Sequence, residues 1–172
     1  MPTMVRAYIG LGSNLADPPG QISQALVALQ ELPGSHLVAQ SACYRSVPLA
    51  GGPVQPDYVN AVVALDTCMG AHELLLCLQR IEKRQGRVRK GTQWGARTLD
   101  LDILLFGDLQ LDEPALTIPH PGLSQRDFVI YPLQEIAPGL SIPGLGNLQD
   151  CIGICPLRGL QRLEIQGEPQ AS

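Results

Sequence analysis

The chain has 172 residues, of which 45% are hydrophobic and 16% are charged, and its net charge is −4. This length suits one domain, which we expect to span 1–172 with a core over about 3–160. The acidic balance excludes a protein that coats nucleic acid through its overall charge. Apolar runs such as Leu74 to Leu78 are far too short to span a membrane, and Met1 to Arg6 has no signal-peptide core, so we expect a cytoplasmic protein.

The five cysteines form no C-x-x-C pair and lie mostly in apolar stretches. This usage is typical of a reducing compartment, where a thiol packs as a small hydrophobic group. Cys151 and Cys155 lie one helical turn apart and could hold a metal, but no histidine accompanies them. Core packing is therefore the preferred interpretation of this pair.

A strand followed by a helix is predicted at the start of the chain. The apolar run Val5 to Leu11 indicates the strand, which ends at Gly12-Ser13-Asn14. Asp17 is placed to cap the helix, Pro18 suits its first turn, and Pro33-Gly34 ends it. The buried stripe of this helix is expected to consist of Ile22, Ala25, Leu26 and Leu29.

Two more strands are predicted in the next third of the chain. They span Leu37 to Ser46 and Tyr58 to Thr67, and both are rich in small or β-branched residues. The connection Val47 to Asp57 contains three prolines and two glycines, a composition that favours a shaped loop over regular structure.

A second helix, Ala71 to Gln85, has Leu74, Leu78 and Ile81 on one face, and Gly86 is placed to end it. A fourth strand, Arg97 to Phe106, turns at Gly107-Asp108, from which a hairpin through Leu109 to Leu111 could follow.

The order strand, helix, strand, strand, helix, strand is that of an α+β domain with a ferredoxin-like βαββαβ core. A Pro- and Gly-rich extension follows Ile118. Short helices are expected there at Ser124 to Ile130 and Leu133 to Ile136, and the residues from Gln166 are expected to fray. The sequence therefore predicts a ferredoxin-like domain with a C-terminal extension.

Two aspartates in the fourth predicted strand are candidates for metal binding. Asp100 and Asp102 alternate with Leu99, Leu101 and Ile103, so the two carboxylates should lie on one face. Neighbouring carboxylates repel each other unless a cation lies between them, and oxygen ligands suit Mg²⁺. We expect a magnesium site here.

The segment before these aspartates is strongly basic. Seven of the twelve Lys and Arg residues lie between Arg80 and Arg97, and Glu82 is the one acid there. A phosphate group would satisfy both the metal and the arginines. Either feature alone is more typical of a solvated surface, but their adjacency favours a magnesium-nucleotide site.

Several blocks of sequence follow one another in the order of a known family. The blocks are Gly12-Ser13-Asn14-Leu15, Tyr44-Arg45-Ser46, Gln55-Pro56-Asp57-Tyr58-Val59-Asn60-Ala61, Gln79-Arg80-Ile81-Glu82, Gly86-Arg87-Val88-Arg89, Trp94-Gly95-Ala96-Arg97-Thr98-Leu99-Asp100-Leu101-Asp102, and Pro119-His120 with Arg126 and Phe128. Together they resemble the family of 6-hydroxymethyl-7,8-dihydropterin pyrophosphokinases, and the resemblance covers nearly the whole chain.

The resemblance implies transfer of pyrophosphate from MgATP to the hydroxymethyl group of the pterin, with AMP released, in folate biosynthesis. It implies that Asp100 and Asp102 hold two Mg²⁺ ions and that Arg87 and Arg97 act with them in catalysis. The positions it implies for ATP binding are Glu82, Arg87, Arg89, Arg97, Ile103, His120 and Arg126. Those it implies for pterin binding are Ser46, Val47, Leu49, Tyr58, Asn60, Trp94 and Phe128.

The residues themselves support a site for a flat heterocycle. Tyr58 and Phe128 offer rings for stacking, and Asn60, on the same strand face as Tyr58, offers an amide that both donates and accepts. A protein of this kind is expected to work as a monomer with no nucleic acid or membrane partner. Three positions depart from the family pattern. Gln93 stands where a basic residue is usual, Ser46 replaces the commoner threonine, and Pro121 follows His120 where some members carry tyrosine.

Two other functions fit parts of the pattern. A ferredoxin-like sheet beside a basic loop could bind single-stranded RNA, although the acidic pair would repel phosphates in the absence of a metal. A metal-dependent phosphohydrolase could use the same two aspartates. The formation of AMP only in the presence of a pterin would separate this second alternative from a pyrophosphokinase.

Overall fold

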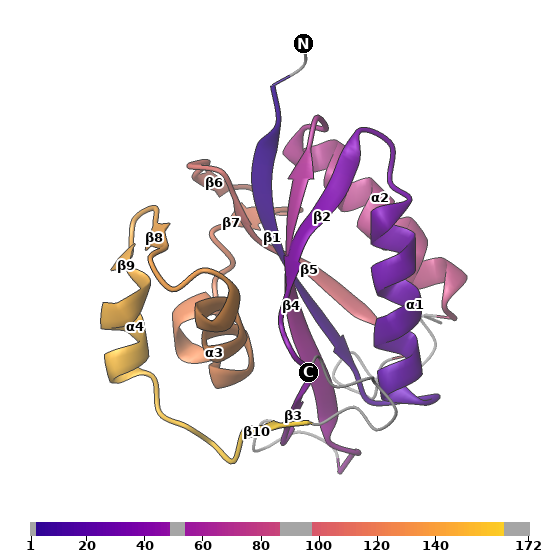
Figure 1. The fold of residues 1–172 in the computed structure, drawn as a ribbon, viewed down its shortest axis with the longest axis vertical. Helices are drawn as coiled ribbons and strands as arrows, with labels where there is room; N and C mark the ends of the chain where they lie inside the picture. Colours follow the sequence, from indigo (N-terminus) through magenta and orange to yellow (C-terminus); the bar gives the residue numbers. More distant parts are fainter. Residues whose placement is uncertain (1–2, 49–53, 87–97, 164–172) are drawn as a thin grey trace, which may run out of the picture.

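The computed structural model describes residues 3–48, 54–86 and 98–163, and its centre is an antiparallel sheet (Figure 1). The sheet is built on β1 (Val5–Ser13), which pairs on one side with β4 (Tyr58–Thr67) and on the other with β5 (Asp100–Phe106). β2 (Ser35–Gln40) and β3 (Tyr44–Ser46) both pair with β4. This antiparallel order is that of the predicted ferredoxin-like core.

Helices cover both faces of the sheet (Figure 1). α1 (Pro18–Gln30) and α2 (Ala71–Arg84) cover one face, and their predicted stripes are buried in a cluster with Ile9, Val63 and Leu101. α3 (Asp127–Ile136) and α4 (Leu148–Ile154) lie over the opposite face. The second cluster includes Tyr8, Val62, Leu104, Ile130 and Leu133.

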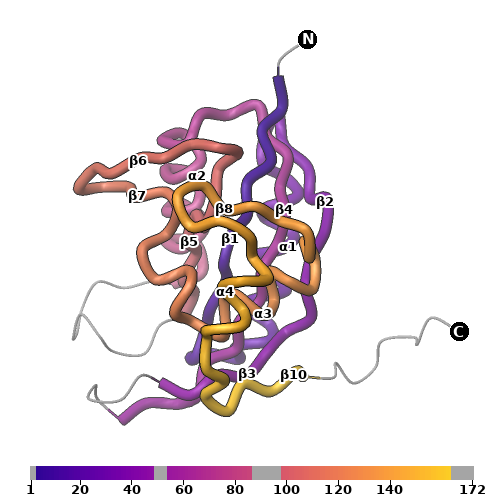
Figure 2. Tube along the Cα trace, turned by 90° about the vertical axis from the view of Figure 1, so that its left-hand side faces the viewer, coloured from indigo at the N-terminus to yellow at the C-terminus, as the bar shows by residue number. Residues whose placement is uncertain are grey.

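Small elements complete the described chain. They are the hairpin β6 (Leu111–Asp112) and β7 (Thr117–Ile118), the 3₁₀ turn η1 (Leu123–Gln125), the hairpin β8 (Ser141–Ile142) and β9 (Gly146–Asn147), and β10 (Gln161–Arg162), which pairs with β3. Figure 2 shows the β6–β7 hairpin projecting from one side of the molecule and β10 beside β3 at the bottom of the view. Within the described ranges, no helix is long and apolar enough to cross a bilayer.

The prediction of one strand over Leu37 to Ser46 is wrong, because the segment breaks into β2 and β3. Ser41 replaces the regular pairing at the break. Its backbone N–H donates to the carbonyl oxygen of Val62 over 2.8 Å, and its hydroxyl accepts from the N–H of Val62 over 2.9 Å. Side chains that bond to the backbone in this way compete with a regular strand ladder.

The predicted cap of α1 also differs. Asp17 precedes the helix but has a φ of 64° and makes no side-chain capping hydrogen bond. The N–H of Gln21 still bonds to the carbonyl oxygen of Asp17 over 2.9 Å. The helix therefore starts with proline in its first turn, without the expected carboxylate cap.

Two expectations for the C-terminal half are wrong. The turn at Gly107 does not lead to a hairpin with β5, because β6 pairs with β7. The two short helices are one helix, α3, which continues through Pro132. Burial of Val129, Ile130 and Leu133 against the sheet offsets the local cost of the proline. The sequence prediction also missed α4 and β10.

Candidate active site

One row of residues across three strands joins the predicted metal and pterin positions. Gly12 of β1 pairs with Asp100 of β5 on one side and with Asn60 of β4 on the other. Two residues earlier in β1, Gly10 pairs with Asp102 on one side and with Val62 on the other. The predicted common face for the two aspartates is confirmed by their alternation with buried Leu101 and Ile103.

Gly12 leaves the centre of this row without a side chain. A Cβ atom added at Gly12 would lie 3.1 Å from Asn60 Nδ2 and 3.8 Å from Tyr58 Cδ1. The Asn60 amide therefore extends over Gly12, towards the strand that carries the aspartates. The sequence marked Gly12 as the end of a strand and gave no sign of this role.

The orientation of the Asn60 amide is fixed by Ser46. The Ser46 hydroxyl donates to Asn60 Oδ1 over 2.6 Å, and both side chains are buried. The oxygen of the amide is thus engaged, so its NH₂ group is the part directed over Gly12. Ser46 acts on the site through Asn60, a relationship that the sequence prediction did not contain.

Glu82 anchors the strand that carries the aspartates. Its side chain is 4% exposed, and its Oε2 accepts from the backbone N–H of Leu101 over 2.9 Å. Leu101 lies between Asp100 and Asp102, so α2 and β5 are joined at the position where the carboxylates are needed. A buried carboxylate requires such partners because desolvation is costly.

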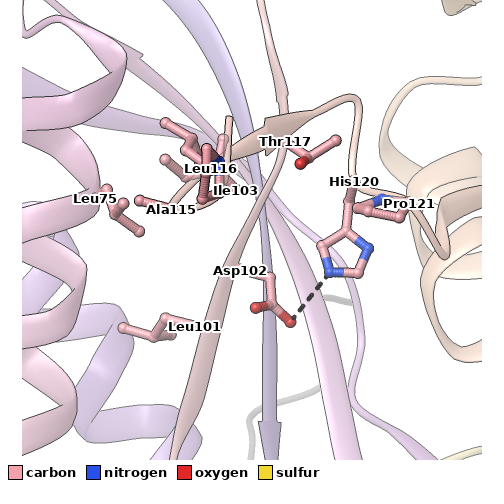
Figure 3. Close-up of a pocket in the computed structure, with 10 residues that line it drawn as sticks. Leu75, Leu101, Asp102, Ile103, Ala115, Leu116, Thr117, His120 and Pro121 are labelled. Atoms are coloured by element: carbon pink, nitrogen blue, oxygen red, sulfur yellow. Dashed lines mark ion pairs between the residues drawn. The ribbon is translucent and has the colours of Figure 1, made fainter. Parts of the chain in front are cut away.

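A cavity of about 250 Å³ lies beside Asp102 (Figure 3). In Figure 3 the Asp102 carboxylate points towards the His120 ring, and Asp102 Oδ2 lies 3.9 Å from His120 Nε2. The cavity is lined by Leu75, Leu101, Asp102, Ile103, Pro114, Ala115, Leu116, Thr117, His120 and Pro121. The predicted residues Asp102, Ile103 and His120 are thus brought together.

The lining of this cavity also contains residues that the sequence analysis did not select. Thr117 offers a hydroxyl, and Leu75, Pro114 and Leu116 offer apolar contact. These residues come from α2 and from the β6–β7 hairpin, which no sequence pattern placed beside β5. Their common location is a property of the tertiary structure.

His120 is held in place by its own loop. Its backbone N–H donates to the carbonyl oxygen of Leu104 over 3.0 Å, and its Nδ1 accepts from the N–H of Gly122 over 3.1 Å. Burial lowers the pKa of His120, the charge of Arg126 lowers it further, and Asp100 opposes them. With Nδ1 accepting, a neutral His120 carries its proton on Nε2, which faces Asp102.

Arg126 and Phe128 lie together at the start of α3. The Arg126 guanidinium carbon lies 5.8 Å from the centroid of the Phe128 ring, within the range of a cation–π contact. Phe128 and Tyr58 are both half-buried. Val47, another predicted pterin contact, is 48% exposed.

Five predicted site residues lie outside the described part of the chain: Leu49, Arg87, Arg89, Trp94 and Arg97. Within the described part, no group of three or more His, Cys, Asp or Glu side chains could hold a metal. Mg²⁺ prefers six oxygen ligands, usually a few carboxylates with water and substrate phosphate. Asp100 and Asp102 fit that pattern, with phosphate supplying further oxygens.

Comparison with known proteins identifies the family. Residues 8–138 match the sequence model of 7,8-dihydro-6-hydroxymethylpterin-pyrophosphokinase (HPPK). The chain belongs to the HPPK family. The match confirms the predicted resemblance and gives no support to the RNA-binding and phosphohydrolase alternatives.

Curated HPPK relatives match almost the whole chain. The 2-amino-4-hydroxy-6-hydroxymethyldihydropteridine pyrophosphokinase of Pseudomonas aeruginosa is 51% identical over 159 residues, covering 92% of this chain and 96% of the relative. The protein of the same name from Haemophilus influenzae is 52% identical over 140 residues, covering 81% and 86% of the two chains.

Solved structures agree with the HPPK fold. The crystal structure of wild-type Plasmodium falciparum HPPK-DHPS with pteroate matches with a TM-score of 0.69 and 14% identity. The match covers 88% of this chain and 42% of the Plasmodium chain, so this chain spans less than half of that longer protein. At this identity the likeness establishes the fold alone.

Proposed function

We propose that this chain transfers pyrophosphate from MgATP to the hydroxymethyl group of 6-hydroxymethyl-7,8-dihydropterin and releases AMP. As a member of the HPPK family it is a pyrophosphokinase, and transfer to this pterin is the step of folate biosynthesis that the family name describes. The residue roles below are the part of the proposal that goes beyond family membership.

Asp100 and Asp102 are proposed to hold two Mg²⁺ ions against the phosphates. Bound Mg²⁺ would neutralise charge on the transferring group and orient it. Arg87 and Arg97 are proposed to supply further positive charge in catalysis. Glu82 supports this arrangement through its hydrogen bond to Leu101, which holds the backbone between the two carboxylates.

The cavity beside Asp102 is proposed to receive the nucleoside part of ATP. Most of its lining residues have apolar side chains, with Ile103 and Leu116 for the base and with Thr117 and His120 as polar groups. This composition is typical of small-molecule sites, in which a few polar groups orient a ligand between apolar walls. Glu82, Arg89 and Arg126 complete the proposed ATP site.

The pterin is proposed to lie between Tyr58 and Phe128, with its polar edge at Asn60. Because Ser46 occupies Asn60 Oδ1, the amide presents N–H donors, so the ligand must offer an acceptor there. A ring carbonyl oxygen or unprotonated ring nitrogen meets that demand. Val47, Leu49 and Trp94 are proposed to complete the pocket.

The observation that carries this proposal is the row Asn60, Gly12, Asp100. Neighbouring strands lie about 4.8 Å apart, so the two ends of the row are separated by about 10 Å. A bicyclic ring held at Asn60 can thus direct its hydroxymethyl oxygen over Gly12 towards metal-bound phosphate. Reaction then requires alignment and charge neutralisation, and no covalent nucleophile.

The test is product analysis with purified protein. We expect AMP and pyrophosphorylated pterin to form in equal amounts from ATP, Mg²⁺ and the dihydropterin, and neither to form when any component is omitted. ADP as product, or AMP without pterin, would contradict the proposal.

A further inference from the structure

The carboxylate of Glu135, near the end of α3, joins that helix to the β2–β3 segment of the sheet. Glu135 Oε2 accepts from the backbone N–H of Ala42 over 2.8 Å, and Glu135 Oε1 accepts from the hydroxyl of Tyr44. Tyr44 begins β3, and Ala42 lies in the break between β2 and β3. These two hydrogen bonds tie α3 to a strand that lies far from it in sequence.

On the helix, Glu135 shares a face with Phe128. The two residues are seven positions apart, which is close to two helical turns, or about 10 Å along the axis. Both lie on the helix that packs against β3 and β4. A restraint at Glu135 therefore limits the rotation and sliding of the face that carries Phe128.

On the sheet, Tyr44 is paired with a residue of the proposed pterin site. In the register of β3 and β4, Tyr44 lies opposite Asn60, and Ser46 lies opposite Tyr58. The Ser46 hydroxyl also bonds to Asn60. The strand held by Glu135 is thus the strand that orients Asn60.

Apolar side chains also pack α3 against the sheet, among them Ile130, Leu133 and Val62. Apolar packing favours burial but has little directional preference. Hydrogen bonds have narrow distance and angle requirements, so the pair at Glu135 adds directional preference to this contact. Burial, with help from Glu135, raises the pKa of Tyr44 to about 12, so its hydroxyl remains a donor at neutral pH.

We propose that Glu135 is a positioning residue that, through Tyr44 and Ala42, sets the separation between Phe128 on α3 and Tyr58 with Asn60 on β4. The gap that this separation defines is the one in which the flat pterin ring is proposed to lie. This inference rests on the proposed function, because it assigns the ring between Phe128 and Tyr58 to the pterin.

The experiment compares Tyr44→Phe and Glu135→Gln with wild type in steady-state kinetics and in calorimetric titration with 6-hydroxymethyl-7,8-dihydropterin in the presence of a non-hydrolysable ATP analogue. Tyr44→Phe removes one donor and keeps the ring. Glu135→Gln keeps one acceptor oxygen and places an NH₂ group where the other was.

Glu135 is exposed and water competes for its hydrogen bonds. For both variants we therefore expect a moderate rise in KM and Kd for the pterin, about three- to tenfold. KM for ATP should stay unchanged.

Two control variants separate positioning from general stability. Tyr131 lies on the same helix, and its hydroxyl donates to the carbonyl oxygen of Cys155 over 3.2 Å, away from β3. Tyr131→Phe removes that hydroxyl. Glu31→Gln makes the same charge change at the end of α1, on the opposite face of the sheet. Both controls should keep the wild-type KM for the pterin, even where Tyr131→Phe lowers the melting temperature as much as Tyr44→Phe does.

Unchanged pterin KM and Kd in both test variants, or an equal rise in Tyr131→Phe, would overturn the inference while leaving the proposed function intact. Failure of wild type to bind the dihydropterin or to form AMP would instead overturn the proposed function, and the inference with it.

Discussion

Glu82 Oε2 accepts a hydrogen bond from the backbone N–H of Leu101 over 2.9 Å. Both residues are buried, each with 4% of its surface exposed. The bond joins the last turns of α2 to β5 between Asp100 and Asp102. Folding of the helical layer and placement of the two carboxylates are therefore linked through one side chain.

Glu82→Ala should lower both stability and turnover. It leaves the Leu101 N–H buried without that acceptor, which costs about 1–3 kcal/mol of unfolding free energy. Urea unfolding measures the loss. Glu82→Gln keeps an acceptor oxygen and is the control, expected to lose less. Equal stability of wild type and Glu82→Ala would show that the bond contributes nothing.

Asp100→Asn and Asp102→Asn should each lower kcat by two or more powers of ten, on the order of a lost charge-stabilising group. Both side chains are half-buried, so the melting temperature should change little. Mg²⁺ titration of activity measures the effect, with exposed Asp112→Asn as the matched control. If a variant keeps normal kcat and Mg²⁺ dependence, the substituted aspartate is not a ligand of the metal.

Gly12→Ala should raise KM for the pterin by about tenfold or more, because the new methyl group would lie 3.1 Å from Asn60 Nδ2 and displace the amide. Gly139→Ala is the control, since a Cβ there would meet no atom within 4 Å. Kinetics with the pterin varied at saturating ATP would measure the change. An unaltered KM in Gly12→Ala would argue against a ligand that crosses this row.

The pair Arg6 and Asp66 should make stability depend on acid pH. Arg6 Nε donates to Asp66 Oδ1 over 2.6 Å, and this bond lowers the pKa of Asp66 from its usual 3.8. A lowered pKa means that the unfolded chain binds a proton first, so the stabilisation is present above pH 3.8 and is lost as the pH falls through the folded-state pKa.

Asp66→Asn should therefore be less stable than wild type at pH 7, by at most about 1 kcal/mol for this partly exposed pair. The difference should shrink as the pH falls below 4. Urea unfolding at several pH values tests this prediction. A difference that stayed constant with pH would place its origin outside the ion pair.

Alternating patterns were reliable where one face of an element is buried. The apolar alternation around Leu101 located β5 and put both aspartates on one face, and the helical spacing of Leu74, Leu78 and Ile81 located α2. The α3 segment shows the limit. The sequence prediction divided it into two helices on either side of Pro132, whereas the structure has one helix that is buried against the sheet.

Local sequence also could not give contacts between distant segments. Ser46 bonds to Asn60, Glu135 bonds to Tyr44, and the β6–β7 hairpin brings Thr117 beside Asp102. None of these pairs has a spacing that a helix or strand period would reveal. The tertiary structure brings them together because the sheet register and the packing of α3 determine which segments meet.

The amino-acid sequence by itself determined the ferredoxin-like strand and helix order, the family and the identity of the candidate metal ligands, because each is written in local periodicity or in contiguous motifs. Only the tertiary structure decided that Asp100, Gly12 and Asn60 form one row, that Ser46 orients the amide at its end, and that α3 is tied to β3. These relationships depend on register and long-range packing, which no short stretch of sequence encodes.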